Sequence, residues 1–284
     1  MKTIFKKDFS TNLAQLHRPP SHLHYQGDIS LIHTPCLAIV GTRKYSTYAK
    51  HATEKLISQL ANYRITIVSG LAKGIDTIAH HAALKHNLKT IAVLGSGLNQ
   101  IYPRENQDLA KQIAQKGLLL SEFEPDQHPT KITFPQRNRI VSGLSLGTLV
   151  IQAPQSSGAL ITARFALDQG RHIFTIPADM DRKDFQGNIE LLQKSAAYPI
   201  IHAKDIIQEL ELTKTKNQTQ PKIQLNLTPS QLQILNTLSP ARGLTAEEIS
   251  QDSSSPLQET LIQLSLLEIK GFVTIEHGTY LRSF

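Results

Sequence analysis

The sequence predicts an α/β fold in which one doubly wound, mostly parallel sheet is followed by a small helical domain. Three observations support this prediction. Six short apolar segments alternate with segments of helical periodicity, which is typical of parallel strands joined by crossover helices. Glycine loops directly follow several of the apolar segments. A polar stretch late in the chain separates a last region of different composition.

The predicted strands are short and rich in leucine and β-branched residues, as expected of strands buried on both faces. They comprise residues 37–40, 65–68, 90–94, 118–121, 148–151 and 172–176. Helices are predicted between them, at residues 49–60, 77–84, 106–116, 139–142 and 160–168. We expect residues 1–30 to form a short N-terminal extension and residues 31–203 to form a Rossmann-like domain.

Two glycine loops occupy the turns between a predicted strand and a predicted helix. Gly41 begins the first loop, which also contains Thr42 and Arg43. The second loop, residues 69–76, contains Gly70. Glycine lets the backbone approach a ligand closely, and the free N–H groups at a helix start attract anions. Because the carboxyl ends of parallel strands share one edge of a sheet, these loops are predicted to form a phosphate-binding rim.

A third glycine loop, Gly95-Ser96-Gly97, is half of a dinucleotide fingerprint. Gln100 stands where the third glycine of that fingerprint belongs, so the loop is predicted to be a tight turn and no dinucleotide cofactor is expected. The loop Ser156-Ser157-Gly158-Ala159 also leaves the carboxyl end of a strand and joins the predicted rim.

The segment Phe134-Pro135-Gln136-Arg137-Asn138-Arg139 combines an aromatic ring, two arginines and an amide. Arginine presents a planar fork of donors to phosphate oxygens, and an exposed aromatic ring offers a stacking face to an unpaired base. The alternative is that the ring lies in the core and that the arginines form a solvated helix start. We expect the segment to fold over the glycine loops and to grip a nucleic-acid strand.

The end of the chain is predicted to be a separate unit. Residues 204–225 lose periodicity and are expected to form a linker. Residues 226–284 contain three predicted helices and a β-ribbon, the element order of a winged helix. The basic residues of this region are Arg242, Lys270 and Arg282, and its acidic residues are Glu247, Glu248, Asp252, Glu259, Glu268 and Glu276. A helix that reads duplex DNA usually presents arginine or lysine, so this acidic domain is expected to contact protein.

Composition narrows the partners and the chemistry. The net charge is +7, and the acidic last domain places the basic excess in the first domain and linker, which favours a polyanionic partner. Cys36 is the single cysteine, which excludes an internal disulfide and every multi-cysteine metal site. His80 and His81 diverge on a helix, so we predict one packed and one exposed histidine and no metal site. With no apolar membrane span or signal peptide, a cytoplasmic protein is expected.

Several of these motifs together resemble the bacterial DNA-processing protein A family, DprA/Smf. They are Val40-Gly41-Thr42-Arg43, Ser69-Gly70-Leu71-Ala72-Lys73-Gly74-Ile75-Asp76 with Ala79-His80, Leu94-Gly95-Ser96-Gly97-Leu98, Tyr102-Pro103, Phe134-Pro135-Gln136-Arg137-Asn138-Arg139 and Ser157-Gly158-Ala159-Leu160-Ile161-Thr162-Ala163. The resemblance covers about residues 20 to 201. It implies an extended Rossmann domain that binds single-stranded DNA, forms a homodimer and loads a RecA-type recombinase during natural transformation.

The resemblance also implies roles for single residues. Arg43 would contact a phosphate, Lys131 would add charge along the backbone and Phe134 would contact a base, while Arg137, Asn138 and Arg139 would shape the pocket. The full set of predicted DNA-binding residues is Gly41, Thr42, Arg43, Ser69, Gly70, Lys73, Lys131, Phe134, Arg137, Asn138, Arg139, Ser157 and Gly158. No catalytic residue, metal ion or cofactor is expected, and the chain is predicted not to be an enzyme. The implied dimer surface is residues 189–201, unless its apolar side chains pack on their own sheet.

Two alternatives remain open, a phosphoribohydrolase and a duplex-binding regulator, and a third, an α/β hydrolase, is disfavoured by the order of its elements. A phosphoribohydrolase on the same sheet would need a carboxylate near the ribose, for which Asp76, Glu122 and Glu124 are the candidates. The string Gly143-Leu144-Ser145-Leu146-Gly147 matches the nucleophile elbow of α/β hydrolases, but the predicted helix and strand stand in the reverse order. A duplex-binding regulator would act through the third helix of the winged-helix domain.

Overall fold

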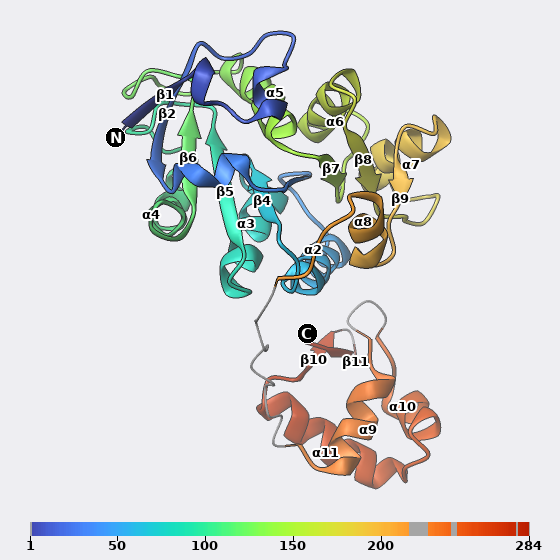
Figure 1. Cartoon of the computed structure of the whole chain (residues 1–284). Helices are drawn as coiled ribbons and strands as arrows, with labels where there is room; N and C mark the ends of the chain where they lie inside the picture. Colours follow the sequence, from blue (N-terminus) through green and yellow to red (C-terminus); the bar gives the residue numbers. More distant parts are fainter. Residues whose placement is uncertain (1, 216–226, 240–242, 277, 284) are drawn as a thin grey trace. The chain divides into compact units, whose positions relative to one another are not determined.

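The computed structural model describes residues 2–215, 227–239, 243–276 and 278–283 (Figure 1). The chain divides into two compact units, Met1–Lys216 and Asn217–Phe284, and each is described by itself. Within the described residues, no helix has both the length and the apolar character needed to cross a membrane.

One large sheet forms the centre of the first unit. Its described strands lie in the order β1-β2-β6-β5-β4-β3-β7-β8-β9. Their bounds are Lys2–Phe5 (β1), His22–Gly27 (β2), Cys36–Val40 (β3), Thr66–Ser69 (β4), Lys89–Leu94 (β5), Leu118–Ser121 (β6), Gly147–Val150 (β7), His172–Thr175 (β8) and Tyr198–Pro199 (β9). Neighbours from β6 to β9 pair in parallel, whereas β2 is antiparallel to both β1 and β6. The prediction of a mostly parallel sheet containing the six apolar segments is confirmed.

The segment expected to be an N-terminal extension contributes β1 and β2 to this sheet. The sequence does not predict these strands, because β2 reads HLHYQG, without a continuous apolar run. An antiparallel strand with one partly solvated face needs fewer apolar residues than a parallel strand that is covered on both faces. The last strand, β9, is two residues long and is likewise not predicted.

Helices cover both faces of the sheet (Figure 1). Their bounds are Thr11–Ala14 (α1), Thr47–Leu60 (α2), Ile75–Lys85 (α3), Gln107–Lys116 (α4), Thr133–Leu144 (α5), Gly158–Asp168 (α6), Gln186–Gln193 (α7) and Ala203–Glu209 (α8), with short 3₁₀ turns at Lys6–Asp8, Ile29–His33, Arg104–Asn106 and Lys183–Phe185. Side chains alternate along β3: Ala38 and Val40 pack in the cluster that contains α5 and α6. Leu37 and Ile39 pack in the cluster that contains α2 and α3. This alternation is the period of a strand that is buried on both faces.

The winding of the sheet creates a crevice. From β3 the chain moves outward through β4 and β5 to β6, and α5 then carries it back to β7 on the other side of β3. Strand order therefore reverses between β3 and β7, so the loops at the carboxyl ends of these two strands diverge. Such a switch point is where doubly wound sheets bind ligands.

The predicted linker begins too early. Residues 203–209 form α8, and Ala203 and Ile206 are buried in the core against α2. Farther along, the backbone N–H of Arg64 donates to the carbonyl of Thr213 at 2.9 Å. The sequence does not predict this helix because its composition is mostly polar. Two buried apolar residues one turn apart are nevertheless enough to anchor a helix of seven residues. Residues 216–225 of the predicted linker lie outside the described residues.

The second unit contains the predicted three helices and ribbon. They are α9 (Pro229–Thr237), α10 (Ala246–Asp252), α11 (Leu257–Ile269) and the antiparallel pair β10 (Val273–Glu276) and β11 (Thr279–Arg282). Thr228 and Thr245 begin α9 and α10 with capping boxes, in which the threonine hydroxyl accepts from the third residue of the helix. A core that includes Ile234, Ile249 and Leu264 holds the helices together.

Candidate nucleic-acid interface

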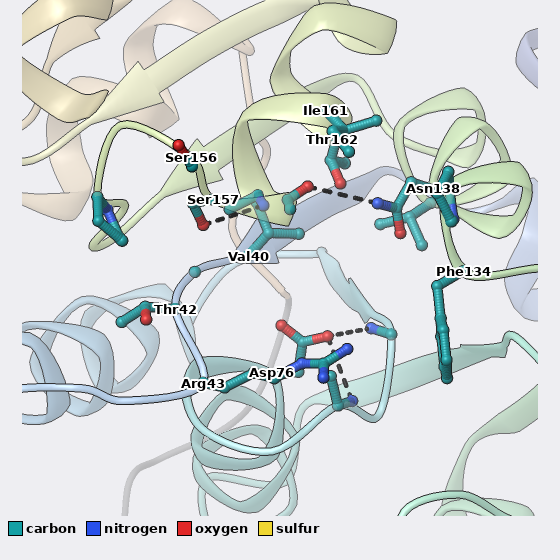
Figure 2. A pocket seen from close by; sticks show the side chains of 18 of the residues that line it. Val40, Thr42, Arg43, Asp76, Phe134, Asn138, Ser156, Ser157, Ile161 and Thr162 are labelled. Atoms are coloured by element: carbon teal, nitrogen blue, oxygen red, sulfur yellow. Dashed lines mark hydrogen bonds between the residues drawn. The ribbon is translucent and has the colours of Figure 1, made fainter. Parts of the chain in front are cut away.

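A pocket of about 480 Å³ lies at the switch point between β3 and β7. Its walls come from the loops after β3 and β4, the first half of α5 and the loop that enters α6, as Figure 2 shows. Most of the predicted DNA-binding residues line it, namely Gly41, Thr42, Arg43, Gly70, Phe134, Arg137, Asn138, Ser157 and Gly158. Four segments that are far apart in the sequence therefore meet at one site.

Arg43 and Phe134 form the mouth of this pocket. The guanidinium carbon of the exposed Arg43 lies 5.7 Å from the centroid of the Phe134 ring. The Phe134 ring is only partly buried, and the Tyr102 ring lies 5.8 Å away at a tilt of 50°. A smaller adjoining pocket is lined by Arg43, Phe134, Tyr102 and Lys73. The alternative that Phe134 is a core residue is wrong, because its ring lines an open pocket beside a cation.

Gly95 lets the Phe134 ring lie against the end of β5. A Cβ added at Gly95 would come within 2.6 Å of the Cδ1 atom of Phe134, which is too close for any real contact. The glycine pair after β5 is thus more than a tight turn, because its first member makes room for the aromatic ring. Sequence alone gave no sign of this contact.

Arg137 is a buried structural arginine. Its side chain is 4% exposed, and it donates to the carbonyl oxygens of Gly70 and Val93. Burial lowers the pKa of Arg137 to about 10, a shift that the carboxylate of Asp76 opposes. A Cβ added at Gly70 would lie 2.4 Å from the guanidinium carbon, so Arg137 could not keep this position beside a larger residue. Arg137 therefore ties the loop after β4 to the pocket floor and is not free to grip a phosphate.

Asp76 completes this buried arrangement. Its carboxylate accepts the backbone N–H groups of Gly70 at 3.1 Å and Ala72 at 3.4 Å. Burial raises the pKa of Asp76, while the nearby Arg137 and the backbone donors act in the opposite direction. Ser69 lies below the pocket, where its hydroxyl donates to the carbonyl of Ile39 at 2.6 Å. Ser69 and Asp76 hold the loop in shape and leave its outer face open.

The start of α6 forms the opposite wall. The Ser157 hydroxyl caps the helix by accepting from the N–H of Ala159 at 3.2 Å, and Asn138 donates to the carbonyl of Gly158 at 3.4 Å. A Cβ added at Gly158 would meet nothing within 4 Å, so this glycine leaves open space instead of accommodating a neighbour. The N-terminal end of the α6 dipole at this wall favours an anionic ligand.

Two predicted site residues near Phe134 do not line the pocket, namely Lys131 and Arg139. Lys131 is exposed and precedes α5. Arg139 forms an ion pair with Glu122 and donates to the carbonyl of Arg18 at 2.7 Å. The predicted role of Arg139 in shaping this pocket is therefore corrected. Successive residues on a helix point about 100° apart, so Phe134, Arg137 and Asn138 share one face and Arg139 lies on another.

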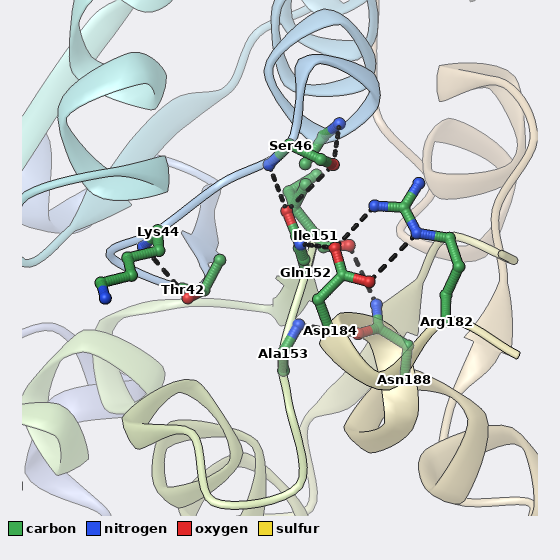
Figure 3. Close-up of polar contacts among 10 residues, drawn as sticks. Thr42, Lys44, Ser46, Ile151, Gln152, Ala153, Arg182, Asp184 and Asn188 are labelled. Atoms are coloured by element: carbon green, nitrogen blue, oxygen red, sulfur yellow. Dashed lines mark hydrogen bonds and ion pairs between the residues drawn. The ribbon is translucent and has the colours of Figure 1, made fainter.

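Several residues of the site carried no recognisable sequence signal. Gln152, at the end of β7, accepts from the backbone N–H of Ser46 at 2.9 Å and donates to Asp184, which also lines the pocket (Figure 3). Arg182 pairs with Asp184 at 2.6 Å, and this hydrogen bond lowers the pKa of the carboxyl group. The pocket therefore has an ion-paired carboxylate on this wall and the cation of Arg43 at its mouth.

Asn188 holds the loop that leaves β7 (Figure 3). Its amide donates to the carbonyl of Ile151 at 2.9 Å and to the hydroxyl of Thr175 at 2.7 Å, and its oxygen accepts from the N–H of Ala153 at 2.8 Å. The side chain is 1% exposed. It therefore links the ends of β7 and β8 next to the pocket.

Two other sequence interpretations can be checked. His80 is fully buried and pairs with the Thr90 hydroxyl at 2.7 Å, while His81 is exposed, so the prediction of one packed and one exposed histidine is confirmed. Ser145 follows α5 and precedes β7, and its buried hydroxyl donates to the carbonyl of Val141. This order and burial rule out a nucleophile elbow at Ser145.

Comparison with known proteins assigns the family. The model of the family described as DNA recombination-mediator protein A matches residues 1–211. Protein Smf of Escherichia coli is 35% identical over 270 residues, which cover 93% of this chain and 72% of that protein. DNA processing protein DprA of Bacillus subtilis is 41% identical over 208 residues, covering 73% of this chain and 70% of that protein.

Solved structures agree with this assignment. The crystal structure of DprA from Streptococcus pneumoniae matches with a TM-score of 0.71 and 39% identity, over 73% of this chain and 74% of that chain. DNA processing protein A from Helicobacter pylori, whose structure was reported for its single-stranded DNA binding mode, matches with a TM-score of 0.68 and 36% identity, over 74% of this chain and 95% of that chain. The chain therefore belongs to the DNA recombination-mediator protein A family, the DprA/Smf family that its motifs resemble.

Proposed function

We propose that this protein binds single-stranded DNA in the pocket between β3 and β7 and does no chemistry on it. The observation that carries the proposal is the Arg43 guanidinium 5.7 Å from the centroid of the partly exposed Phe134 ring. A phosphate can pair with the arginine while the neighbouring base stacks on the ring. The family relative from Helicobacter pylori, with its reported single-stranded DNA binding mode, supports this ligand.

The proposed biological role is to protect incoming single strands and to present them to a RecA-type recombinase in natural transformation and recombination. The family assignment supports a mediator role. Two copies of the pocket in a homodimer would hold a long strand at two points and raise avidity without tighter single contacts. Such a role places the protein in the cytoplasm, where recombination takes place.

We locate the proposed dimer surface at the outer edge of the sheet. In the predicted segment 189–201, Ile200 is buried, but Tyr198 on β9 is 52% exposed and Ile201 is 69% exposed. Substitution Ile201→Asp is expected to shift the protein from dimer to monomer in sedimentation analysis. A native protein that sediments as a monomer at all concentrations would contradict the dimer.

We further propose that the second unit is a winged helix that contacts protein. The order of three helices and a hairpin supports the fold, as does the antiparallel bridge between Leu244 and Tyr280 beside that hairpin. On α11 the exposed residues include Leu261, Ile262 and Leu266, which do not suit a phosphate backbone. Substitution Ile262→Glu is expected to leave the affinities for single-stranded and duplex DNA unchanged. A change in duplex affinity would favour the duplex-binding regulator.

The phosphoribohydrolase alternative depends on a carboxylate that is free to act on a ribose. Glu122 pairs with Arg139, and Asp76 lines the pocket but is held by two backbone N–H groups. These contacts support a binding protein over a hydrolase. Release of free base from a nucleoside monophosphate by the native protein, lost in Asp76→Asn, would establish the enzyme instead.

The test of DNA binding compares single-stranded and duplex oligonucleotides of equal length by fluorescence anisotropy over a series of salt concentrations. We expect the native protein to prefer the single strand and the double variant Arg43→Gln/Phe134→Ala to lose that preference. Equal affinity for duplex, unchanged in the double variant, would contradict the pocket. Recombinase loading is tested separately, by asking whether the native protein accelerates strand exchange by a RecA-type recombinase on single strands coated with single-strand-binding protein.

A further inference from the structure

Outside the pocket, two histidines and one carboxylate converge near the β1 edge of the sheet. His22 and His24 lie on β2, and Glu124 follows β6, the strand that pairs with β2. One ligand atom from each of the three side chains lies within 4.8 Å of the other two. We propose that these residues bind a divalent transition-metal ion of the zinc type.

The sheet register brings these residues together. Residues two apart on a strand point to the same face, so His22 and His24 share a side of β2. His24 is the Cα partner of Ser121 on β6, and Glu124 is three residues farther along the chain. The turn after β6 thus brings the carboxylate back over the two imidazoles. The spacing of His22 and His24 becomes informative only once β2 is known to be a strand, so the sequence alone does not predict this cluster.

The hydrogen bonds of the two rings leave the same nitrogen available on each. Nδ1 of His24 lies 2.9 Å from the Thr3 hydroxyl, and Nδ1 of His22 lies 2.9 Å from the Ser21 hydroxyl. Hydrogen bonding at one ring nitrogen orients the other nitrogen toward a metal and is usual for histidine ligands. Both Nε2 atoms point at Glu124, at 3.8 Å for His22 and 3.9 Å for His24. These separations are too long for hydrogen bonds.

A buried and unsatisfied nitrogen is the strongest sign of a ligand. His24 is 9% exposed, and its Nε2 atom is buried without a hydrogen-bond partner. A buried polar atom of this kind costs stability unless something satisfies it. In the tautomer that carries its proton on Nδ1, Nε2 of His24 has a free lone pair, and a metal ion between His24 and Glu124 would bind it.

Size and donor type favour zinc. Ligand atoms about 2.0–2.1 Å from a tetrahedral ion are about 3.4 Å apart, whereas the three ligand atoms here lie within 4.8 Å of one another, so the site has to contract by up to about 1.4 Å when the ion binds. The Glu124 side chain is 73% exposed and can rotate to close this gap. Two imidazoles and a carboxylate suit zinc better than magnesium or calcium, which prefer oxygen ligands, and they leave a fourth position for water. The ion would fasten β2 to the connection that leads toward Lys131 and Phe134.

The test uses the full chain without an affinity tag, stripped of metal by a chelator. Zn²⁺ is titrated by competition with a chelating dye, and Co²⁺ is added separately to record the visible absorption of a tetrahedral ion. We expect one ion per chain. Loss of a hydrogen bond to a ligand weakens metal binding by about 10- to 100-fold, so His24→Gln and Glu124→Gln should each weaken it by at least about 100-fold. His33→Gln, which removes an exposed histidine elsewhere, should have no effect.

Glu124→Gln and one further variant, Thr3→Val, separate metal binding from folding. Glu124 is exposed, so Glu124→Gln should keep the native circular-dichroism spectrum. Thr3→Val removes only the hydrogen bond to Nδ1 of His24 and should weaken Zn²⁺ binding by about 10-fold. Zn²⁺ should raise the Tm of the native chain and not that of Glu124→Gln. The proposal is overturned if Glu124→Gln binds Zn²⁺ as tightly as the native chain, or if His33→Gln weakens binding as much as His24→Gln. It does not depend on DNA binding.

Discussion

The guanidinium of Arg43 and the ring of Phe134 lie 5.7 Å apart, centroid to guanidinium carbon, although 90 residues of sequence separate them. Arg43 lies in the loop after β3, and Phe134 lies in the first turn of α5, the helix that carries the chain back across the sheet. The change of winding direction at β3 is what brings a cation and an aromatic face to one pocket mouth. A strand of DNA offers one phosphate and one base per nucleotide, which matches this pair.

Loss of the aromatic face should weaken single-strand binding. We expect Phe134→Ala to reduce affinity by about 5- to 150-fold, because stacking of a base on an aromatic side chain contributes about 1–3 kcal/mol. Fluorescence anisotropy with a labelled oligonucleotide measures the change. Phe165→Ala, at a ring that lines a different pocket, is the matched control and should change the affinity little.

Gly95 should act through the same ring. An added methyl group at this position collides with Phe134, so Gly95→Ala should displace the ring and weaken single-strand binding in the same direction as Phe134→Ala. When Gly95→Ala is added to Phe134→Ala, the affinity should fall little further, because the ring that the added methyl group would displace is already absent. Additive losses in the anisotropy assay would show that Gly95 acts elsewhere.

Arg43 should account for about one phosphate contact. For a single strand, each contact contributes about 0.7 to the slope of log affinity against log salt concentration. Arg43→Gln should therefore make that slope shallower by about 0.7, and Arg43→Lys should restore most of it. Lys55→Gln removes an exposed charge from α2, outside the pocket lining, and should leave the slope unchanged.

Arg137 should matter for stability and not as a phosphate ligand. Arg137→Met leaves the carbonyl oxygens of Gly70 and Val93 without their donor and removes the positive charge near the buried Asp76, which should cost about 1–3 kcal/mol. Urea unfolding measures the loss. Adding Asp76→Asn should recover part of it, because the neutral amide needs no countercharge. Arg139→Met, at the partly exposed pair with Glu122, should cost only about 1 kcal/mol or less.

His80 should make the protein sensitive to acid. Burial lowers the pKa of His80 to about 3, whereas a histidine of an unfolded chain titrates near about 6.5. Between these pH values the unfolded chain binds a proton at His80 and the folded chain does not. The contribution of neutral His80 to the free energy of unfolding is therefore fully present above about pH 6.5 and is lost as the pH falls toward 3. The raised pKa of Asp76 acts in the opposite direction over part of this range.

The comparison of variants isolates the effect of His80. Urea unfolding at a series of pH values gives the free energy of unfolding. Between about pH 6.5 and 3 this free energy should fall by a few kcal/mol less in His80→Gln than in the native chain. His81→Gln, at the exposed neighbour, should follow the native profile. Parallel profiles for the native chain and His80→Gln would contradict this assignment.

The strongly patterned parts of the fold could be predicted from the sequence. Segments such as Leu118–Ser121 are apolar throughout because both faces of a parallel strand are buried, and loops such as Gly41–Ser46 keep a recognisable strand-to-helix composition. The antiparallel strand β2 could not be predicted, because its stability comes from pairing with a strand almost 100 residues away in the chain. Pairing of that kind leaves no local periodicity.

The sequence predicts most of the residues that line the pocket, but it does not predict which of them face the pocket and which support its structure. Residue types in the Phe134–Arg139 segment pointed to nucleic-acid binding, yet they could not show that Arg137 turns inward to the carbonyls of Gly70 and Val93. Helix phase decides which arginine faces the pocket, and α5 begins at Thr133, six residues before the predicted helix start. Asp184 lines the pocket and Asn188 lies next to it only because segments that are distant in the sequence pack together.

The most direct test of the central claim is photo-crosslinking of the native protein to a single-stranded oligonucleotide that carries 5-iododeoxyuridine, followed by mass spectrometry of the linked peptide. We expect the crosslink at Phe134, with loss of the product in Phe134→Ala and strong reduction in Arg43→Gln. A dominant crosslink in the second unit, unaffected by either substitution, would contradict the proposal that the pocket between β3 and β7 holds the strand.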